Sequence, residues 1–354
     1  MNPARPSARR TRVVCGSALA ASLLLTACGP GESDDGTITL RLAHYMPTSN
    51  INVSEGVEVW MREVEERTGG RVEFEYYPSS QLVSAEQIIS SLRTGTVDVG
   101  AFVPATAAPA ELPLSEVPTV PGYDASDLRV VQNAYQEMLA GPLAEEWGEA
   151  GIRPVMGMVP GRYQFLVQGE PRRTLDDWQG TSVRTPGGVA DFLIEGMGAA
   201  PIAIPGPEQY EAMQRGTADS SLSSLEAVPA YGFHEVSDAA TTNAPLGVVI
   251  TVLGVSAETY EELPEDVRVA MSEASEVTLD SYQDAREIQL EDAVEVTSND
   301  LEYYELGEGD LEDLQRAITE AQERWVQQRE EHGQPGQEVL DAWYEALDRA
   351  EQER

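Results

Sequence analysis

An alternation of strand-like and helix-like segments occurs twice in the sequence and limits the chain to an α/β fold. In the first half the segments follow one another in the order 37–44, 53–67, 72–77, 84–95 and 96–103. In the second half the order is 152–159, 164–168, 181–184, 189–196, 201–204, 207–215 and 217–222. β-branched or alternating segments between segments of helical periodicity are typical of largely parallel sheets covered by helices.

The last strand of each series is preceded by the same short motif. Gly95-Thr96-Val97-Asp98 follows the second helix of the first series, and Gly216-Thr217-Ala218-Asp219 occupies the same place in the second. Glycine suits the left-handed conformation that ends many helices. The repetition favours two lobes built from similar α/β units. After Pro264 the chain becomes helical, with helices predicted at 264–298, 310–332 and 337–353.

The N-terminal 27 residues have the features of an export signal. A basic start precedes the apolar run 13–27, which is too short to span a bilayer comfortably, since that takes about 20 residues. The run ends in Leu25-Thr26-Ala27-Cys28, which resembles the bacterial lipobox and implies cleavage before a lipidated Cys28. An ordinary secretory signal with a chance cysteine is the alternative. Residues 28–36 would then be the lipidated cysteine and a polar tether, and the protein an extracytoplasmic, membrane-anchored lipoprotein.

The charge of the chain excludes several classes of partner. There are 61 acidic residues against 23 basic ones, all of them arginine, for a net charge of −38. No basic face is available for nucleic acid or for an anionic membrane surface. Such an acid excess is typical of adaptation to high salt, and the absence of lysine is typical of a GC-rich genome; we favour both explanations together. Cys15 and Cys28 are the only cysteines, which excludes a disulfide scaffold and a Cys-based metal cluster.

Residue types that carry catalysis are scarce. The chain has three histidines, at His44, His234 and His332, and no HExxH, GxSxG, GxxxxGK[ST] or GxGxxG pattern. The many glutamates lie on predicted helices and are best interpreted as solvated faces. We therefore expect neither an enzyme nor a metal or cofactor site.

Arg184 is the basic residue best placed to bind an anion. It closes a predicted strand and is followed by Thr185-Pro186-Gly187-Gly188 and a helix. The turn lies at the carboxyl edge of the sheet, where α/β folds bind ligands, and the helix start offers free N–H groups. The planar guanidinium matches a carboxylate. An ion pair between Arg184 and a surface acid is the alternative, and Arg162 is a weaker second candidate.

Ordered matches across the chain support a family resemblance. The sequence resembles the DctP-type solute-binding proteins of TRAP (tripartite ATP-independent periplasmic) transporters over roughly residues 38–290. The matching stretches are 40–44 (LRLAH), 64–72 (VEERTGGRV), 77–82 (YPSSQL), 92–98 (LRTGTVD), 173–180 (RTLDDWQG), 183–184 (VR), 208–219 (EQYEAMQRGTAD) and 263–267 (LPEDV).

The resemblance implies an α/β fold of two lobes around a ligand cleft, bridged by crossing strands and a long hinge-spanning helix, with a helical C-terminus. Lobe 1 would comprise 37–150 with part of 245–275, and lobe 2 would comprise 151–244. The long inter-lobe helix and C-terminal helices would occupy 264–354. The protein would capture a small organic carboxylate and deliver it to the small and large TRAP membrane subunits. A receptor for a sensor and a secreted carboxylate-processing enzyme are the alternatives.

Candidate ligand-binding residues follow from the resemblance and from strand-end positions. Arg184 would hold the ligand carboxylate. The other candidates are Arg162, Gln164, Tyr45, Phe102, Ser223, Ser224 and Asn243. The sequence departs from the family at Ser221-Leu222-Ser223-Ser224, where Gln-Glu-Asn-Pro is common, and the family's second arginine falls nearer Gln164 than Arg162. Both departures weaken the case for a C4-dicarboxylate, so a monocarboxylate or a zwitterion fits as well.

Overall fold

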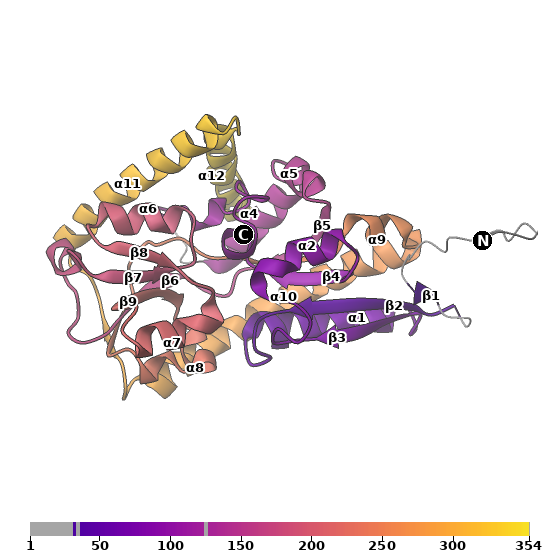
Figure 1. Cartoon of the computed structure of the whole chain (residues 1–354), viewed down its shortest axis with the longest axis horizontal. Coiled ribbons are helices and arrows are strands. Elements are labelled where there is room, and N and C mark those ends of the chain that lie inside the picture. The colour runs from indigo at the N-terminus through magenta and orange to yellow at the C-terminus, as the bar shows by residue number, and fades with distance from the viewer. Residues whose placement is uncertain (1–30, 33–35, 124–126, 354) are drawn as a thin grey trace, which may run out of the picture.

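The computed structural model describes residues 31–32, 36–123 and 127–353. The predicted signal peptide (1–27) and Cys28 lie outside the described residues, as does most of the predicted tether. Within that tether, Gly31–Glu32 forms the short strand β1, which pairs antiparallel with β2. Together with β1, the other described residues fold into two lobes, each built around a six-stranded sheet (Figure 1).

The first-lobe sheet combines a parallel unit with two antiparallel strands from later in the chain. β2 (Ile38–His44) lies between β3 (Val72–Tyr77) and β4 (Val99–Phe102) and is parallel to both. β11 (Thr251–Ser256) pairs antiparallel with β4 and with β5 (Ile152–Met158). The lobe boundary therefore lies in the crossing segment 159–162, and not at 150 as expected, because β5 completes the first sheet.

The second-lobe sheet has the order β12-β10-β6-β9-β7-β8. Its strands are β6 (Tyr163–Val167), β7 (Ser182–Thr185), β8 (Ala200–Ala203), β9 (Ser220–Ser224), β10 (Ala239–Thr241) and β12 (Glu302–Tyr304). β7 is parallel to β8 and β9, whereas β6 is antiparallel to β9 and β10. Both sheets are thus mixed, although their strand–helix units are parallel as predicted.

Short helices connect the strands within each lobe. In the first lobe they are α1 (Glu58–Arg67), α2 (Ile88–Arg93), α3 (Pro104–Ala107), α4 (Leu128–Ala140), α5 (Ala144–Glu149) and α9 (Ala257–Glu262). In the second lobe they are α6 (Val189–Gly196), α7 (Gln209–Gln214) and α8 (Ala227–Tyr231). A π-helical turn at Asn52–Val57 leads into α1.

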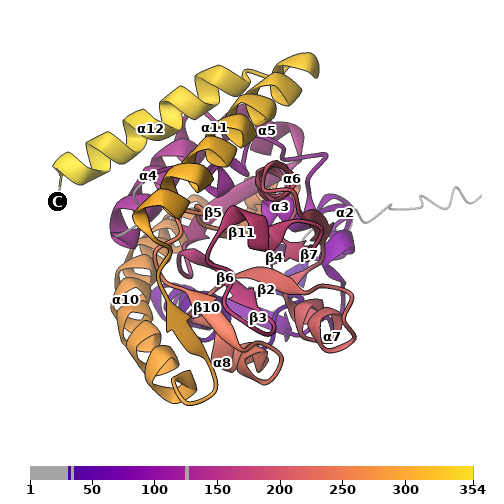
Figure 2. The same ribbon diagram turned by 90° about the vertical axis from the view of Figure 1, so that its left-hand side faces the viewer.

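Three long C-terminal helices join the lobes on the outside. α10 (Glu265–Thr297) packs against α1 of the first lobe and α8 of the second. The Trp60 indole N–H donates to the Met271 carbonyl at 3.2 Å and to the Ser275 hydroxyl at 3.0 Å, which fixes α1 to α10. α11 (Glu308–Glu331) packs on α6, and α12 (Gly336–Gln352) packs on α4 (Figure 2).

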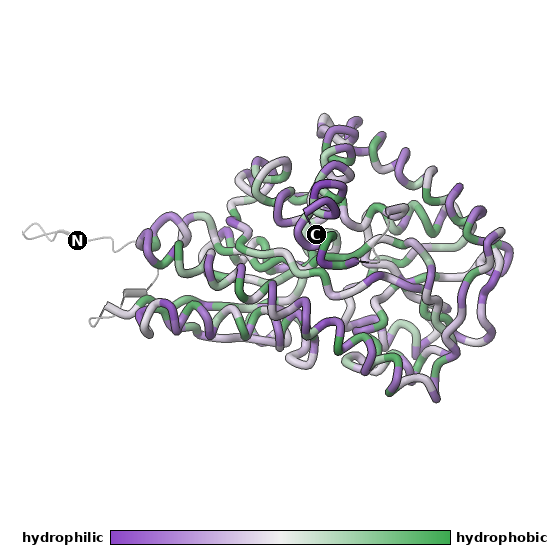
Figure 3. Tube along the Cα trace, turned by 180° about the vertical axis from the view of Figure 1, so that it is seen from behind, coloured by the Kyte–Doolittle hydropathy of each residue, from purple (hydrophilic) through white to green (hydrophobic). Residues whose placement is uncertain are grey.

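The largest aromatic side chains are buried in the interior of the fold, and the outer helices expose mostly hydrophilic residues. All five tryptophans are buried, and the outer helices alternate hydrophilic and hydrophobic residues along their length (Figure 3). In the described part of the chain, no helix combines the length and the apolar character that crossing a membrane requires.

The local predictions around the repeated motif are confirmed. Ser84 and Gln87 form the predicted capping box, and Gly95 and Gly216 have positive φ angles of 65° and 68°. The predicted helix 189–196 has these bounds in the structure. α4, α5, β10 and β11 were not predicted.

Candidate ligand-binding site

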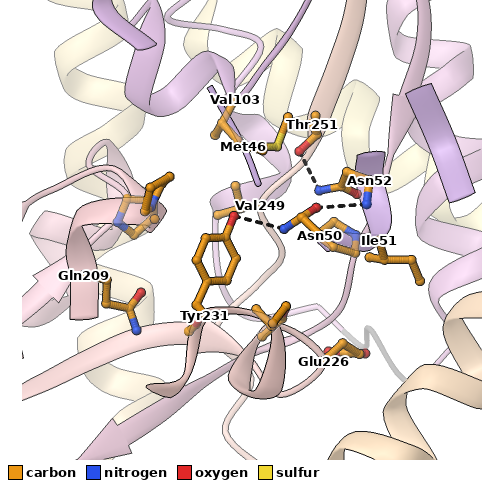
Figure 4. A pocket seen from close by; sticks show the side chains of 18 of the residues that line it. Met46, Asn50, Ile51, Asn52, Val103, Gln209, Glu226, Tyr231, Val249 and Thr251 are labelled. Atoms are coloured by element: carbon orange, nitrogen blue, oxygen red, sulfur yellow. Dashed lines mark hydrogen bonds between the residues drawn. The ribbon is translucent and has the colours of Figure 1, made fainter. Parts of the chain in front are cut away.

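A cavity lies between the two lobes and includes about 720 Å³ of space not filled by atoms, counting its opening to solvent. The loop after β2 contributes Tyr45, Met46, Asn50, Ile51 and Asn52. Val103, directly after β4, and Thr106 on α3 also line the cavity. The second lobe contributes side chains from the ends of β7 and β9 and from α7 and α8. These are Arg184, Pro186, Gln209, Ser223, Ser224, Glu226, Ala227, Ala230 and Tyr231, with Tyr163 from β6 and Phe233 after α8 (Figure 4).

Arg184 is the one cation among the described residues that line the cavity. Its side chain is 2% exposed, and burial lowers its pKa. Nε donates to the Ile204 carbonyl at 2.7 Å, and Nη1 donates to the Leu222 carbonyl at 2.8 Å. No described carboxylate forms an ion pair with it. A buried charge without a partner is costly, so the site is suited to an anionic ligand.

The turn after Arg184 is held against the first lobe. The Thr106 hydroxyl donates to the Pro186 carbonyl at 2.8 Å. Gly187 and Gly188 have φ angles of 96° and 67°, and a Cβ on Gly188 would lie 1.9 Å from Oε2 of Glu116. Two protein carboxyls, those of Glu116 and Asp191, lie at the start of α6. That the N–H groups at the start of α6 add donors to the anion site stays a prediction.

A hydrogen-bond network crosses the cavity between the lobes. Nδ2 of Asn50 donates to the Tyr231 hydroxyl at 3.0 Å, and Oδ1 of Asn50 accepts from the Asn52 N–H at 2.9 Å (Figure 4). Asn52 donates in turn to the Thr251 hydroxyl on β11 and accepts from Tyr282 on α10. Asn52 is thereby fixed by two further elements, and Asn50, which bonds to its backbone, links the first lobe to Tyr231 of the second.

Glu226 is a buried acid at the edge of the cavity. It is 3% exposed, and its Oε2 makes no hydrogen bond to a described residue. Burial raises its pKa to about 7, although Arg286 and Arg162 favour its charged form. It packs against Gly161 in the crossing segment, where a Cβ would lie 2.0 Å from Oε2. Near neutral pH this carboxyl is therefore poised between its neutral and charged forms.

Four of the predicted site residues line the cavity: Arg184, Tyr45, Ser223 and Ser224. The remaining four do not. Phe102 is buried in the first-lobe core against Trp147, at 5.9 Å between ring centroids, and Val103 takes the place at the cavity.

Gln164 points to the opposite face of β6 from Tyr163, because successive side chains of a strand alternate. It donates to the Ala244 carbonyl at 3.0 Å and accepts from the Thr241 hydroxyl at 2.8 Å. Asn243 exchanges two hydrogen bonds with the Leu306 backbone. Arg162 and Asn243 border a separate hollow near Tyr123.

Sequence reasoning missed Asn50, Tyr163, Gln209 and Tyr231. Tyr163 could have been found from the alternation, since it neighbours the predicted Gln164. Gln209 could have been found from helical spacing, because it shares the buried face of α7 with Ala212 and Met213. Asn50 lies in an irregular loop, where no periodicity indicates its direction. In the described part of the chain, no three His, Cys, Asp or Glu side chains come close enough to hold a metal ion.

The chain is similar to known proteins over most of its length. Residues 42–329 match the family model described as bacterial extracellular solute-binding protein, family 7. A solute-binding protein from Albidiferax ferrireducens is 27% identical over 241 residues, which are 66% of this chain and 70% of the relative.

Solved structures agree with the fold. A TRAP solute-binding protein from Rhodoferax ferrireducens, in complex with copurified benzoate, has a TM-score of 0.81 at 21% identity. The match covers 89% of this chain and 99% of that one. A marine metagenome TRAP solute-binding protein from an unidentified microbe, specific for aromatic acid ligands and bound to 3-hydroxybenzoate, has a TM-score of 0.80 at 19% identity, with the same coverage.

Proposed function

Because the chain belongs to the bacterial extracellular solute-binding protein family 7, we propose that its inter-lobe cavity captures a small organic carboxylate outside the cytoplasm. The protein then delivers this ligand to the small and large membrane subunits of a TRAP transporter. It acts as a receptor and leaves the ligand chemically unchanged. The single observation that carries the proposal is Arg184, a buried cation that lines the cavity without a carboxylate partner.

Arg184 is pre-oriented for a carboxylate. Two backbone carbonyls hold its Nε and Nη1, so the guanidinium loses little freedom when a ligand binds. The Tyr163 hydroxyl interacts with it and supplies a further polar contact. A charge-assisted pair between guanidinium and carboxylate, shielded from water, is among the stronger interactions available to a small ligand.

The cavity favours a monocarboxylate over a dicarboxylate. A second carboxylate would meet no further cation among the lining residues, and it would approach the acid Glu226. Met46, Ile51, Val103, Val249 and Phe233 provide apolar surface for the body of the ligand. The benzoate and 3-hydroxybenzoate bound by the two structural neighbours are consistent with an aromatic or apolar body.

The lobes close on the ligand as a hinge. Asn50 bonds to Tyr231 and Thr106 bonds to Pro186 directly across the cavity, so opening must break both hydrogen bonds. Few segments join the lobes, and such a geometry is typical of hinge closure around a ligand. Small-angle scattering checks this proposal, with a smaller radius of gyration expected when ligand is added to ligand-free protein.

We further propose that Cys28 carries the lipid that anchors the receptor to the membrane. The lipobox-like Leu25-Thr26-Ala27-Cys28 supports this. Intact-mass analysis of membrane-extracted protein should give a chain that begins at an acylated Cys28. A water-soluble chain that begins at another residue would contradict the anchor without affecting the binding site.

Mass spectrometry of ligand released from purified protein tests the proposed function. We expect a small monocarboxylic acid that is recovered unchanged after prolonged incubation with the protein. Conversion of the acid into a product would instead support the enzyme alternative.

A further inference from the structure

Gln209 is a buried amide on the cavity wall that the binding of a carboxylate by Arg184 does not use. It is the first residue of α7, is fully buried, and lines the cavity (Figure 4). Neither Oε1 nor Nε2 makes a hydrogen bond to any described residue. The lack of partners does not depend on which way the amide is turned.

A buried amide with no partner destabilises the folded protein, because it has given up its hydrogen bonds to water. Ala212 and Met213, which share its face of α7, are apolar and bury without this cost. The polar side chain at this position therefore needs a reason outside the folding of α7. Its place on the wall of the cavity indicates that the partner is the bound ligand.

The two atoms of the amide specify what that partner must offer. Oε1 accepts hydrogen bonds and Nε2 donates them. An ionised carboxylate has acceptors only, so it satisfies Nε2 but leaves Oε1 unpaired. A second polar group that carries an O–H or N–H is required.

We infer that Gln209 is a specificity-determining residue that binds a second polar group of the ligand, and that this group is a hydroxyl or a carboxamide. Both groups donate and accept, as the amide does, whereas an ammonium only donates. This inference rests on the proposed function and narrows its ligand class to hydroxylated or carbamoylated monocarboxylates. A ligand without such a group leaves the buried amide unsatisfied and binds more weakly.

A matched panel of carboxylates tests the inference on the wild-type protein. The aromatic probes are benzoate and its hydroxy, carbamoyl and aminomethyl derivatives at each ring position. The aliphatic probes are butyrate, 3-hydroxybutyrate, succinamate and 4-aminobutyrate. Calorimetry should give at least one hydroxylated or carbamoylated member that binds 10-fold or more tightly than its unsubstituted parent and than the amine.

Gln209→Met isolates the contribution of the amide, since methionine is unbranched and of similar length. It should remove the preference, weakening binding of the favoured member by roughly 10- to 100-fold while the parent stays within about threefold. The ligand-free melting temperature should be unchanged or higher, because an unsatisfied polar group has been removed. A purely structural amide would give a lower melting temperature and unchanged selectivity.

Gln283→Met is the control. Gln283 on α10 is also buried with both amide atoms unpaired, but it does not line the cavity. Its replacement should leave the ligand preference unchanged.

The outcomes separate the inference from the proposed function. Equal affinity of the wild type for the parents and their hydroxylated or carbamoylated derivatives overturns the inference and leaves the proposed function standing. The same holds if Gln209→Met retains the wild-type preference. If no carboxylate in the panel binds, the proposed function fails and the inference falls with it.

Discussion

The unit β2-α1-β3-α2-β4 of the first lobe and the unit β7-α6-β8-α7-β9 of the second have the same strand order. In each, the first strand lies between the second and the third and is parallel to both. Asp98 accepts from the Arg41 N–H at 2.8 Å, and Asp219 accepts from the Ser182 N–H at 2.8 Å. The backbone N–H of each aspartate also donates to the carbonyl of the same partner residue. The repeated Gly-Thr-x-Asp motif thus makes equivalent contacts in the two lobes.

The two units differ at the position that Arg184 occupies on the cavity wall. Arg184 pairs with Ser221, two residues after Asp219, and Ala43 pairs with Gly100, two residues after Asp98. Ala43 therefore occupies in the first lobe the place of Arg184 in the second. The third strands also differ in polarity, since β4 (VGAF) has no polar side chain and β9 (SSLSS) has four serines. The second-lobe unit thus supplies Arg184 from β7 and two serines from β9 to the cavity, whereas no residue of β4 lines it.

The largest effect should come from removing the charge that distinguishes the two units. Truncating one partner of a buried ion pair costs on the order of 2–5 kcal/mol, so Arg184→Ala should weaken carboxylate binding by roughly 30- to several-thousand-fold. Arg184→Lys should restore only part of the affinity, because a point charge does not reproduce the planar fork. Calorimetry measures both changes.

Arg162→Ala is the matched control for this prediction. Arg162 lies in the crossing segment but outside the cavity, so its replacement should leave affinity within about threefold. An equal loss in both variants would mean that the overall charge of the protein, and not the site, governs binding.

The next prediction concerns the pH dependence of stability, to which one buried carboxyl in each lobe contributes. Burial raises the pKa of Glu116 and of Glu226 to about 7, from an ordinary value of 4.5. Between these pH values each of the two carboxyls keeps its proton in the folded state and loses it in the unfolded state, so each should contribute a loss of stability as pH rises from about 4.5 to about 7. At ~1.4 kcal/mol per pKa unit, the loss is on the order of 3 kcal/mol for each carboxyl.

Urea unfolding at pH 5 and pH 7.5 measures this loss. Glu116→Gln and Glu226→Gln should each show a smaller loss than the wild type. Burial also lowers the pKa of His44 to about 4, which opposes this loss equally in the wild type and in the variants. The same pH dependence of stability in the wild type and in both variants would therefore contradict the assignment.

A smaller effect on stability is expected from the aspartates of the repeated motif. Replacing each one tests whether Asp98 and Asp219 stabilise the fold equally. Asp98 is 3% exposed and also binds the Arg41 guanidinium at 2.9 and 3.0 Å, whereas Asp219 binds the Ser182 hydroxyl and is more exposed. We expect Asp98→Asn to lower the free energy of unfolding by about 2 kcal/mol and Asp219→Asn by about 1 kcal/mol. Chemical denaturation of the two variants side by side gives the comparison, and a larger loss for Asp219→Asn would reverse it.

The smallest effect on ligand binding should come from one of the two hydrogen bonds across the cavity, that between Asn50 and Tyr231. Asn50→Ala and Tyr231→Phe each remove the same hydrogen bond, worth about 1 kcal/mol, so each should weaken ligand binding by roughly fivefold. The double variant should be no weaker than either single variant. Additive losses would mean that the two residues contact the ligand separately.

Much of the fold could be predicted from the sequence because the repeated units obey simple periodicities. Glycine at the helix ends and the capping box at Ser84 restrict where these helices end and begin. β11 could not be predicted, because a strand buried in the middle of a sheet has no alternation of polar and apolar residues. The missed α4 is different, since its buried residues do follow helical spacing.

The candidate site was predictable where the strand geometry determines it. Arg184 is the last but one residue of the parallel strand β7, at the edge where ligands bind, and the structure places it at the cavity. Gln164 and Phe102 were predicted at the ligand site from their position along a strand. The alternation of side chains directs both away from the cavity. Asn50 and Tyr231 come together only through the packing of one lobe on the other, so no local pattern indicates them.

The pairing between Arg184 and the ligand carboxylate is the central claim, and a comparison of the captured acid with its neutral carboxamide tests it most directly. Calorimetry of both compounds with the wild type and with Arg184→Ala gives a complete cycle. We predict that the wild type binds the acid at least 30-fold more tightly than the amide, and that Arg184→Ala binds the two within about threefold of each other. If Arg184→Ala still discriminates as the wild type does, the carboxylate is bound elsewhere.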